Sequence, residues 1–114
     1  MVDEPNVFQA KLDQLKQEFK QNLPSKIDQI RDQWLSLRNG DWEMDQLSDL
    51  LGSVHKIAGS GGIFGFSKVS EVACKIESLL QKATRSKEPI NEKGIRAMEV
   101  YLEELNEAIY SFDE

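Results

Sequence analysis

The sequence is short of the residues that most catalytic and metal sites require, since it contains one histidine, His55, and one cysteine, Cys74. A zinc site needs several such ligands at short spacings, and no C-x-x-C or H-x-x-x-H spacing is present. A Ser-His-Asp triad would have to use His55, but no G-x-S-x-G elbow accompanies it. A G-x-x-x-x-G-K-[ST] phosphate loop is also missing. We therefore expect no metal site and no enzyme of these classes.

Positive charge and long apolar runs are also scarce. Lys and Arg number 14 against 20 Asp and Glu, which gives a net charge of −6. Nucleic-acid binding needs a surplus of cations on one face, so we expect no nucleic-acid partner. The longest apolar runs are too short to cross a bilayer, and the acidic segment 1–5 does not resemble a secretory signal. The length fits a single domain over residues 1–114, which we expect in the cytoplasm and away from membranes.

Strand-like alternation is absent, and apolar residues recur at spacings of three and four. Leu23-Pro24 is expected to end a helix, because proline disfavours helix at the residue before it. Asp41, Ser67 and Asn91 are expected N-caps. The pattern predicts helices over residues 6–22, 24–38, 42–61, 67–84 and 91–112. With short connections, these favour an all-α fold: an antiparallel up-down four-helix bundle with an additional N-terminal helix covering one end.

Each predicted helix carries one apolar stripe. In chain order the stripes are Phe8, Leu12, Leu15 and Phe19; Ile27, Ile30, Trp34 and Leu37; Met44, Leu47, Leu50, Leu51, Val54, Ile57 and Ala58; Val69, Val72, Ala73, Ile76, Leu79, Leu80 and Ala83; and Ile95, Met98, Leu102, Leu105, Ile109 and Phe112.

His55 lies at the border of the stripe in the third helix. At about 100° per residue, with Val54 at zero, the apolar arc ends near about +80° and His55 falls near about +100°. We therefore expect an imidazole that is exposed to solvent. Its neighbours on the helical wheel are small: Ser48, Gly52, Gly59 and Gly62. A glycine inside a helix costs about 1 kcal/mol relative to alanine, so Gly59 needs a reason, which is close helix packing, clearance for a partner, or both.

The segment from His55 to Phe66, HKIAGSGGIFGF, resembles the signature of histidine phosphotransfer (HPt) domains of bacterial phosphorelays. That signature has a histidine, an aliphatic residue two positions on, a glycine four positions on, small residues, and an aromatic or aliphatic residue before a second glycine. The matching positions are Ile57, Gly59, Ser60, Gly61, Phe64 and Gly65. Gly40-Asp41-Trp42 also resembles the family's entry to this helix, and Leu23-Pro24 its first break.

The resemblance implies a phosphocarrier without ATP-dependent kinase activity, phosphorylated on Nε2 of His55. It implies response-regulator receiver domains, a hybrid sensor histidine kinase, or both, as partners. The receiver would supply Mg²⁺, and this chain would need no cofactor of its own. Docking is expected to use Leu51 and the glycine gap in a transient interface, and we expect a monomer.

The sequence departs from the family at one position. Many members carry a lysine three residues after the histidine, where this chain has Ala58. Lys56 and Lys68 are candidates for the supporting cation, although Lys56 would have to reach around the helix and is better explained as a solvated surface charge. Glu77 lies just outside the apolar arc of the fourth helix, where some members place a polar group near the histidine, and an ordinary exposed glutamate is the alternative.

Two other functions fit the sequence. One is a helical adaptor that binds a receiver or kinase through the same face without being phosphorylated. The other is a purely structural bundle that self-associates through residual apolar surface. Only the phosphocarrier would take up acid-labile, base-stable phosphate from a phosphorylated receiver.

Overall fold

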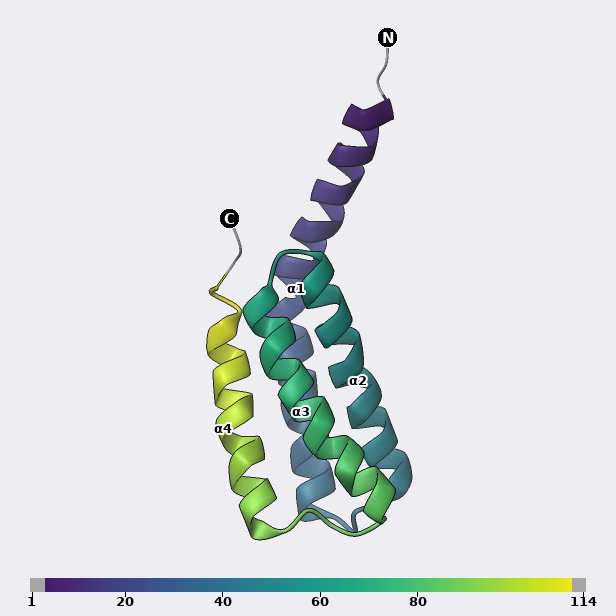
Figure 1. Ribbon diagram of the computed structural model, residues 1–114, viewed down its shortest axis with the longest axis vertical. Coiled ribbons are helices and arrows are strands. Elements are labelled where there is room, and N and C mark those ends of the chain that lie inside the picture. Colours follow the sequence, from purple (N-terminus) through teal and green to yellow (C-terminus); the bar gives the residue numbers. More distant parts are fainter. Residues whose placement is uncertain (1–3, 112–114) are drawn as a thin grey trace.

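The computed structural model describes residues 4–111, with side chains from residue 7 onward, and this part of the chain is helical with no strand. Its helices are α1 (Glu4–Asn39), α2 (Met44–Ile63), α3 (Ser67–Ser86) and α4 (Glu92–Ala108). Each helix packs against the next in the chain, and α4 returns to contact α1. The helices alternate in direction (Figure 1). The predicted antiparallel up-down bundle is confirmed.

α1 is one continuous helix of 36 residues, so the predicted break at Leu23-Pro24 is wrong. The apolar stripe keeps to the same face across the proline, because Leu23 and Ile27 are both buried. Burial of each contributes about 1.5–3 kcal/mol. Together they offset the roughly 3 kcal/mol that proline costs inside a helix. Pro24 itself is exposed, on the solvent side of α1.

The expected additional N-terminal helix is also wrong, because residues 6–22 form the first part of α1. At about 1.5 Å per residue, α1 is about 54 Å long and α2 only about 30 Å. The excess projects beyond the end of the bundle (Figure 1), and the longest dimension of the molecule is 59 Å. Along the described side chains of α1, Phe19 is the first that is buried. We call residues 4–18 the overhang.

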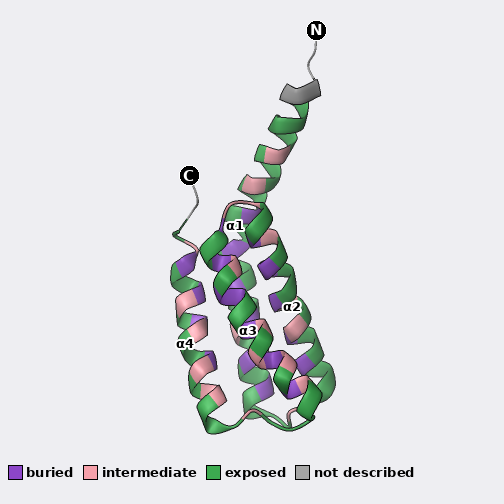
Figure 2. Cartoon of the chain, viewed as in Figure 1, coloured by how far each residue is buried: buried purple, intermediate pink, exposed green. Residues whose placement is uncertain are grey.

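The core lies between the inner faces of the helices, where the buried positions gather (Figure 2). Within the described residues, no polar or charged side chain is fully buried. Met44 was expected in the stripe but is 41% exposed, because it is the first residue of α2 and lies outside the covered part of the helix. Phe112, expected in the last stripe, lies outside the described residues. Fully buried side chains from all four helices include Trp34, Leu50, Ile76 and Met98.

Asp41 does not cap α2. The helix begins at Met44, and the N-cap residue is Glu43, whose side chain makes no capping hydrogen bond. Trp42 stands in the left-handed region with φ of 56° and packs edge-on against Trp34, with 5.9 Å between ring centroids. This aromatic contact keeps the connection after Asp41 out of helical geometry, so α2 begins at Met44 and not at residue 42 as predicted.

The two remaining cap predictions have different outcomes. Ser67 is already the first residue of α3, and the N-cap is the buried Phe66, so this prediction is wrong. The prediction for Asn91 is confirmed, because the Gly94 backbone N–H donates to Asn91 Oδ1 at 2.9 Å. α3 runs to Ser86, two residues beyond its predicted end, and α4 ends at Ala108, four residues before its predicted end.

Candidate functional site

The turn between α2 and α3 fixes the two helices that carry the site. α2 ends at Ile63, and Gly65 follows in the left-handed region with φ of 88°. The Phe66 N–H then donates to the carbonyl of Gly61 at 2.8 Å. This is the hydrogen bond of a Schellman motif, in which glycine is favoured at the left-handed position. The second glycine of the signature is therefore explained by the reversal of the chain.

Close packing continues just beyond this turn. A Cβ atom on Gly61 would lie 3.3 Å from the backbone oxygen of Phe66 and 3.3 Å from the backbone nitrogen of Ser70. The Ser70 hydroxyl donates to the carbonyl of Ala58 at 2.7 Å, and Ala58 is buried. The sequence did not predict this contact of Ser70. Its only signal was a small polar side chain between the apolar positions of α3.

His55 and Glu77 meet across this pair of helices. His55 Nδ1 lies 2.5 Å from Glu77 Oε2. The histidine side chain is 74% exposed, whereas the glutamate side chain is 16% exposed. An ionised carboxylate can only accept hydrogen bonds, so Nδ1 is the donor and Nε2 of a neutral ring keeps its lone pair. Nε2 faces away from the carboxylate. The expected exposure of His55 is confirmed, and Glu77 is not the ordinary exposed glutamate that was its alternative reading.

A line of small residues runs along α2 past the imidazole. Ser48, Gly52, Gly59 and Gly62 are all exposed, as expected from the helical wheel. A Cβ atom on Gly52 or Gly59 would meet nothing within 4 Å. Close helix packing therefore does not explain Gly59. A Cβ atom on Gly62 would make an ordinary van der Waals contact with Ser70 Oγ, at 3.5 Å.

The apolar flank of the histidine is less open than the glycine line. Leu51 is half-buried and packs against the core. Its exposed part borders the same helix turn as His55, four residues further on. Leu51 can offer a partner only an edge of apolar surface.

The structure does not bring either candidate cation to the imidazole. Lys56 lines a groove with Lys26 and Gln29 of α1, on another side of α2. Lys68 pairs with Glu71, with 3.7 Å between Nζ and Oε2. It also lies nine residues before Glu77, which is about 14 Å along α3 and about 180° around it. The position of the missing lysine, Ala58, is buried against α3.

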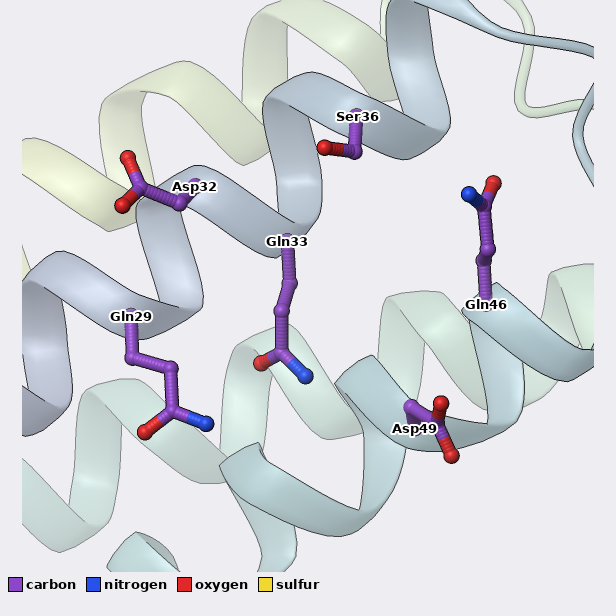
Figure 3. Close-up of a pocket in the computed structure, with 6 residues that line it drawn as sticks. All are labelled: Gln29, Asp32, Gln33, Ser36, Gln46 and Asp49. Atoms are coloured by element: carbon purple, nitrogen blue, oxygen red, sulfur yellow. The ribbon is translucent and has the colours of Figure 1, made fainter.

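A second hollow, between α1 and α2, is polar and lies away from the histidine. It encloses about 300 Å³. The carboxylates of Asp32 and Asp49 point in opposite directions (Figure 3), so they do not form a cation site. Residues 4–111 contain no cluster of three or more His, Cys, Asp or Glu that could hold a metal ion. The lining residues are Gln29, Asp32, Gln33, Ser36, Gln46 and Asp49.

The helices do not suit a membrane span, because none of those in residues 4–111 is both long and apolar enough to cross a bilayer. Cys74, the single cysteine, is exposed and free.

Comparison with known families identifies the bundle. The family model of the Hpt domain matches residues 14–109, a span that contains His55, Glu77 and the α2–α3 turn. No curated protein and no solved structure matched the chain. Hpt domains act in the phosphotransfer of two-component signalling, interact with receiver domains and kinases, and lack kinase activity. Because the match covers most of the 114 residues, the chain belongs to the histidine phosphotransfer (Hpt) domain family.

Proposed function

We propose that this protein relays a phosphoryl group between receiver-domain aspartates, with His55 as the phosphoacceptor. The observation that carries the proposal is the exposed imidazole, held at Nδ1 by Glu77 and flanked by glycines with open space beside them. A nucleophilic imidazole needs a free lone pair and an approach path. Both are present on the Nε2 side.

In the proposed step, the Nε2 lone pair of His55 attacks the phosphorus of an aspartyl phosphate on the receiver. An N–P bond forms, the P–O bond to the acyl oxygen breaks, and the aspartate leaves as a carboxylate. The proton on Nδ1 stays in place. The phosphorylated ring is then cationic, and the Glu77 carboxylate stabilises that charge. A second receiver aspartate reverses the step and collects the group.

Glu77 is proposed as a positioning residue. Its carboxylate selects the tautomer in which Nε2 carries the lone pair, and it limits rotation of a ring that is otherwise exposed. A hydrogen bond to a charged group contributes about 1.5–3 kcal/mol, which corresponds to about tenfold to 100-fold in a rate or equilibrium constant.

The partner is proposed to supply the remaining groups. Phosphoryl transfer requires positioning and charge neutralisation, usually with Mg²⁺. Neither Lys56 nor Lys68 lies where it would neutralise the phosphoryl group, so we propose that cations and Mg²⁺ come from the receiver. Receiver domains or a hybrid sensor kinase, met in the cytoplasm, would dock over Leu51 and the line formed by Ser48, Gly52, Gly59 and Gly62.

His55→Gln tests the proposal directly. The purified protein is incubated with a receiver domain carrying labelled aspartyl phosphate, and acid-labile, base-stable label on the chain is measured. The wild-type protein should become labelled. The variant should remain unlabelled with an unchanged circular dichroism spectrum. Equal labelling of both proteins would refute the assignment, and receiver binding without any labelling of the wild type would favour the unphosphorylated adaptor.

Glu77→Gln and Glu77→Ala test the positioning role. A glutamine carbonyl can still accept from Nδ1–H but carries no charge, whereas alanine removes both functions. We expect the transfer rate to fall in the order wild type, Gln, Ala, with a total loss of about tenfold to 100-fold. The ¹⁵N shifts of the His55 ring should show the Nδ1–H tautomer in the wild type and lose that preference in Glu77→Ala. Unchanged tautomer populations would contradict this role.

A further inference from the structure

The overhang carries exposed apolar side chains that no other helix of the described residues covers. Phe8 is 70% exposed, Val7 64% and Leu15 41%. Apart from the bundle that begins at Phe19, no other described helix lies beside residues 7–18 (Figures 1 and 2). A helix of about 15 residues is marginal in water by itself, and clustered exposed apolar side chains mark interaction surfaces. The family match begins at residue 14, so most of the overhang, residues 4–13, lies outside it.

We propose that the overhang pairs in antiparallel orientation with the overhang of a second copy of this chain. Phe8, Leu12 and Leu15 follow each other at spacings of four and three, and Phe19, four residues further on and buried in its own bundle, continues the same line. This is the seam of a coiled coil, in which such positions interdigitate. In an antiparallel pair, Leu12 of one copy layers against Leu15 of the other, and the same contact recurs across the twofold axis.

The direction of the seam favours the antiparallel arrangement. Phe8 and Phe19 differ by about 20° around the helix, so the seam of the overhang continues the face that α1 turns toward its own core. In a parallel pair, the second bundle would have to occupy the space of the first. In an antiparallel pair, the two bundles lie at opposite ends of the paired helices.

The end of the bundle at the α2–α3 turn provides a surface on which the helix of the second copy can pack. Phe19 packs against Phe64 and Phe66, with 5.4 Å and 5.7 Å between ring centroids, so the α2–α3 turn closes the bundle at that level. Ile63, at this turn, is 70% exposed. Phe8 of the second copy would arrive here and cover it. The apolar seam and the bundle end would then form one continuous interface.

Charge complementarity supports the same orientation. Lys11 and Glu18 flank the seam on one edge, seven residues apart. In an antiparallel pair, this edge of one copy lies against the same edge of the other copy. Lys11 of each copy therefore faces Glu18 of the other. In a parallel pair Lys11 would face Lys16, and like charges repel. Among the described residues, neither Lys11 nor Glu18 belongs to an ion pair within the chain.

The proposed dimer differs from the monomer that we expected from the sequence, and it does not depend on the proposed function. The full-length protein is tested by sedimentation velocity over a range of concentrations, together with helicity at 222 nm. We expect a reversible dimer whose helicity rises as the dimer forms, because the overhang frays when alone. Leu12→Glu should be monomeric with lower helicity. A wild-type protein that stays monomeric at every concentration would overturn the proposal.

Charge reversal tests the orientation. Lys11→Glu and Glu18→Lys each turn two attractions into repulsions, which should weaken self-association about tenfold. An equimolar mixture of the two variants restores both attractions and should form heterodimers of wild-type affinity. Lys16→Glu is the matched control, with the same charge change as Lys11→Glu but no charged group opposite it in the antiparallel pair. Tighter association of Lys11→Glu would instead indicate parallel pairing and refute the model. Phosphate uptake by His55 should be unchanged in all of these variants, which separates failure of the dimer from failure of the proposed function.

Discussion

Replacing Gly52 and Gly59 by alanine should stabilise this protein while slowing its phosphoryl transfer. Both glycines lie inside α2, and a Cβ atom at either position meets nothing within 4 Å. Alanine is favoured over glycine inside a helix by about 1 kcal/mol. No packing penalty opposes this gain, so the double variant should be more stable by about 2 kcal/mol.

The stability change is measurable in two ways. Thermal unfolding should show an increase of about 4 °C for each kcal/mol in a domain of this size, or about 8 °C for the double variant. Urea unfolding followed by tryptophan fluorescence should show a higher midpoint at an unchanged slope, since Trp34 is fully buried. A lower midpoint would mean that the added methyl groups meet part of the bundle, and the open geometry around Gly59 would then be wrong.

The expected effect on phosphoryl transfer is tested by side chains of increasing size at residue 59. Gly59→Ala should transfer more slowly than the wild type, and Gly59→Leu slower still, by about 100-fold, because a displacement of about 1 Å between reacting atoms has an effect of that size. Gln46→Leu is the control, about 180° around α2 from His55. Normal transfer by a folded Gly59→Leu protein would refute clearance as the reason for this glycine.

Three further substitutions test how the bundle is held together. Pro24→Ala should raise the free energy of unfolding by as much as about 3 kcal/mol, and no change in thermal unfolding would indicate that α1 is broken there in solution. Gly65→Ala should destabilise the protein by about 1–2 kcal/mol, because alanine is strained at positive φ, and an unchanged urea midpoint would argue against the Schellman turn. Ser70→Ala should cost about 1 kcal/mol through loss of its hydrogen bond to the Ala58 carbonyl, whereas Ser48→Ala, on the exposed face of α2, should leave the midpoint unchanged or slightly higher, because alanine has the higher helix propensity.

Much of the fold could be predicted because apolar periodicity reports which face of each helix is buried. The stripes of α3 and α4 agree with the structure in their described positions. The error at Pro24 arose from a local rule, the cost of proline, whose outcome depends on non-local burial. Leu23 and Ile27 supply that burial, and a single sequence does not show it.

The candidate site could be predicted where position on one helix was sufficient. His55 is the only imidazole, and the helical wheel places it at the edge of the stripe. Its contact with Glu77 depends on the register between two helices, which the α2–α3 turn sets. Lys56 and Lys68 remained open choices because a helical wheel cannot say how far a cation lies from an atom on another helix.

The same limitation explains why the overhang could not be recognised from sequence. Phe8 to Phe19 and Ile27 to Leu37 repeat with nearly the same spacing, so the pattern alone treats the two segments alike. In the structure, the second segment packs against α2 and α4, whereas Phe8 and Leu15 of the first segment stay exposed and only Phe19, at its end, packs against the bundle. Periodicity identifies a face that needs a partner, and only the lengths of α2, α3 and α4 decide whether the chain itself provides one.

The glycines around His55 divide by physical cause, and this division links the fold to the proposed chemistry. Gly61 and Gly65 are required by close approach and by positive φ, so they build the hairpin that brings Glu77 to the imidazole. A Cβ atom on Gly52 or Gly59 would meet none of the described residues within 4 Å, and each glycine lowers the stability of α2. Substitution of Gly61 or Gly65 should therefore affect folding, whereas substitution of Gly52 or Gly59 should affect phosphoryl transfer. If Gly59→Leu and Gly65→Ala both changed only the stability, or both changed only the transfer rate, this division of the glycines would be wrong.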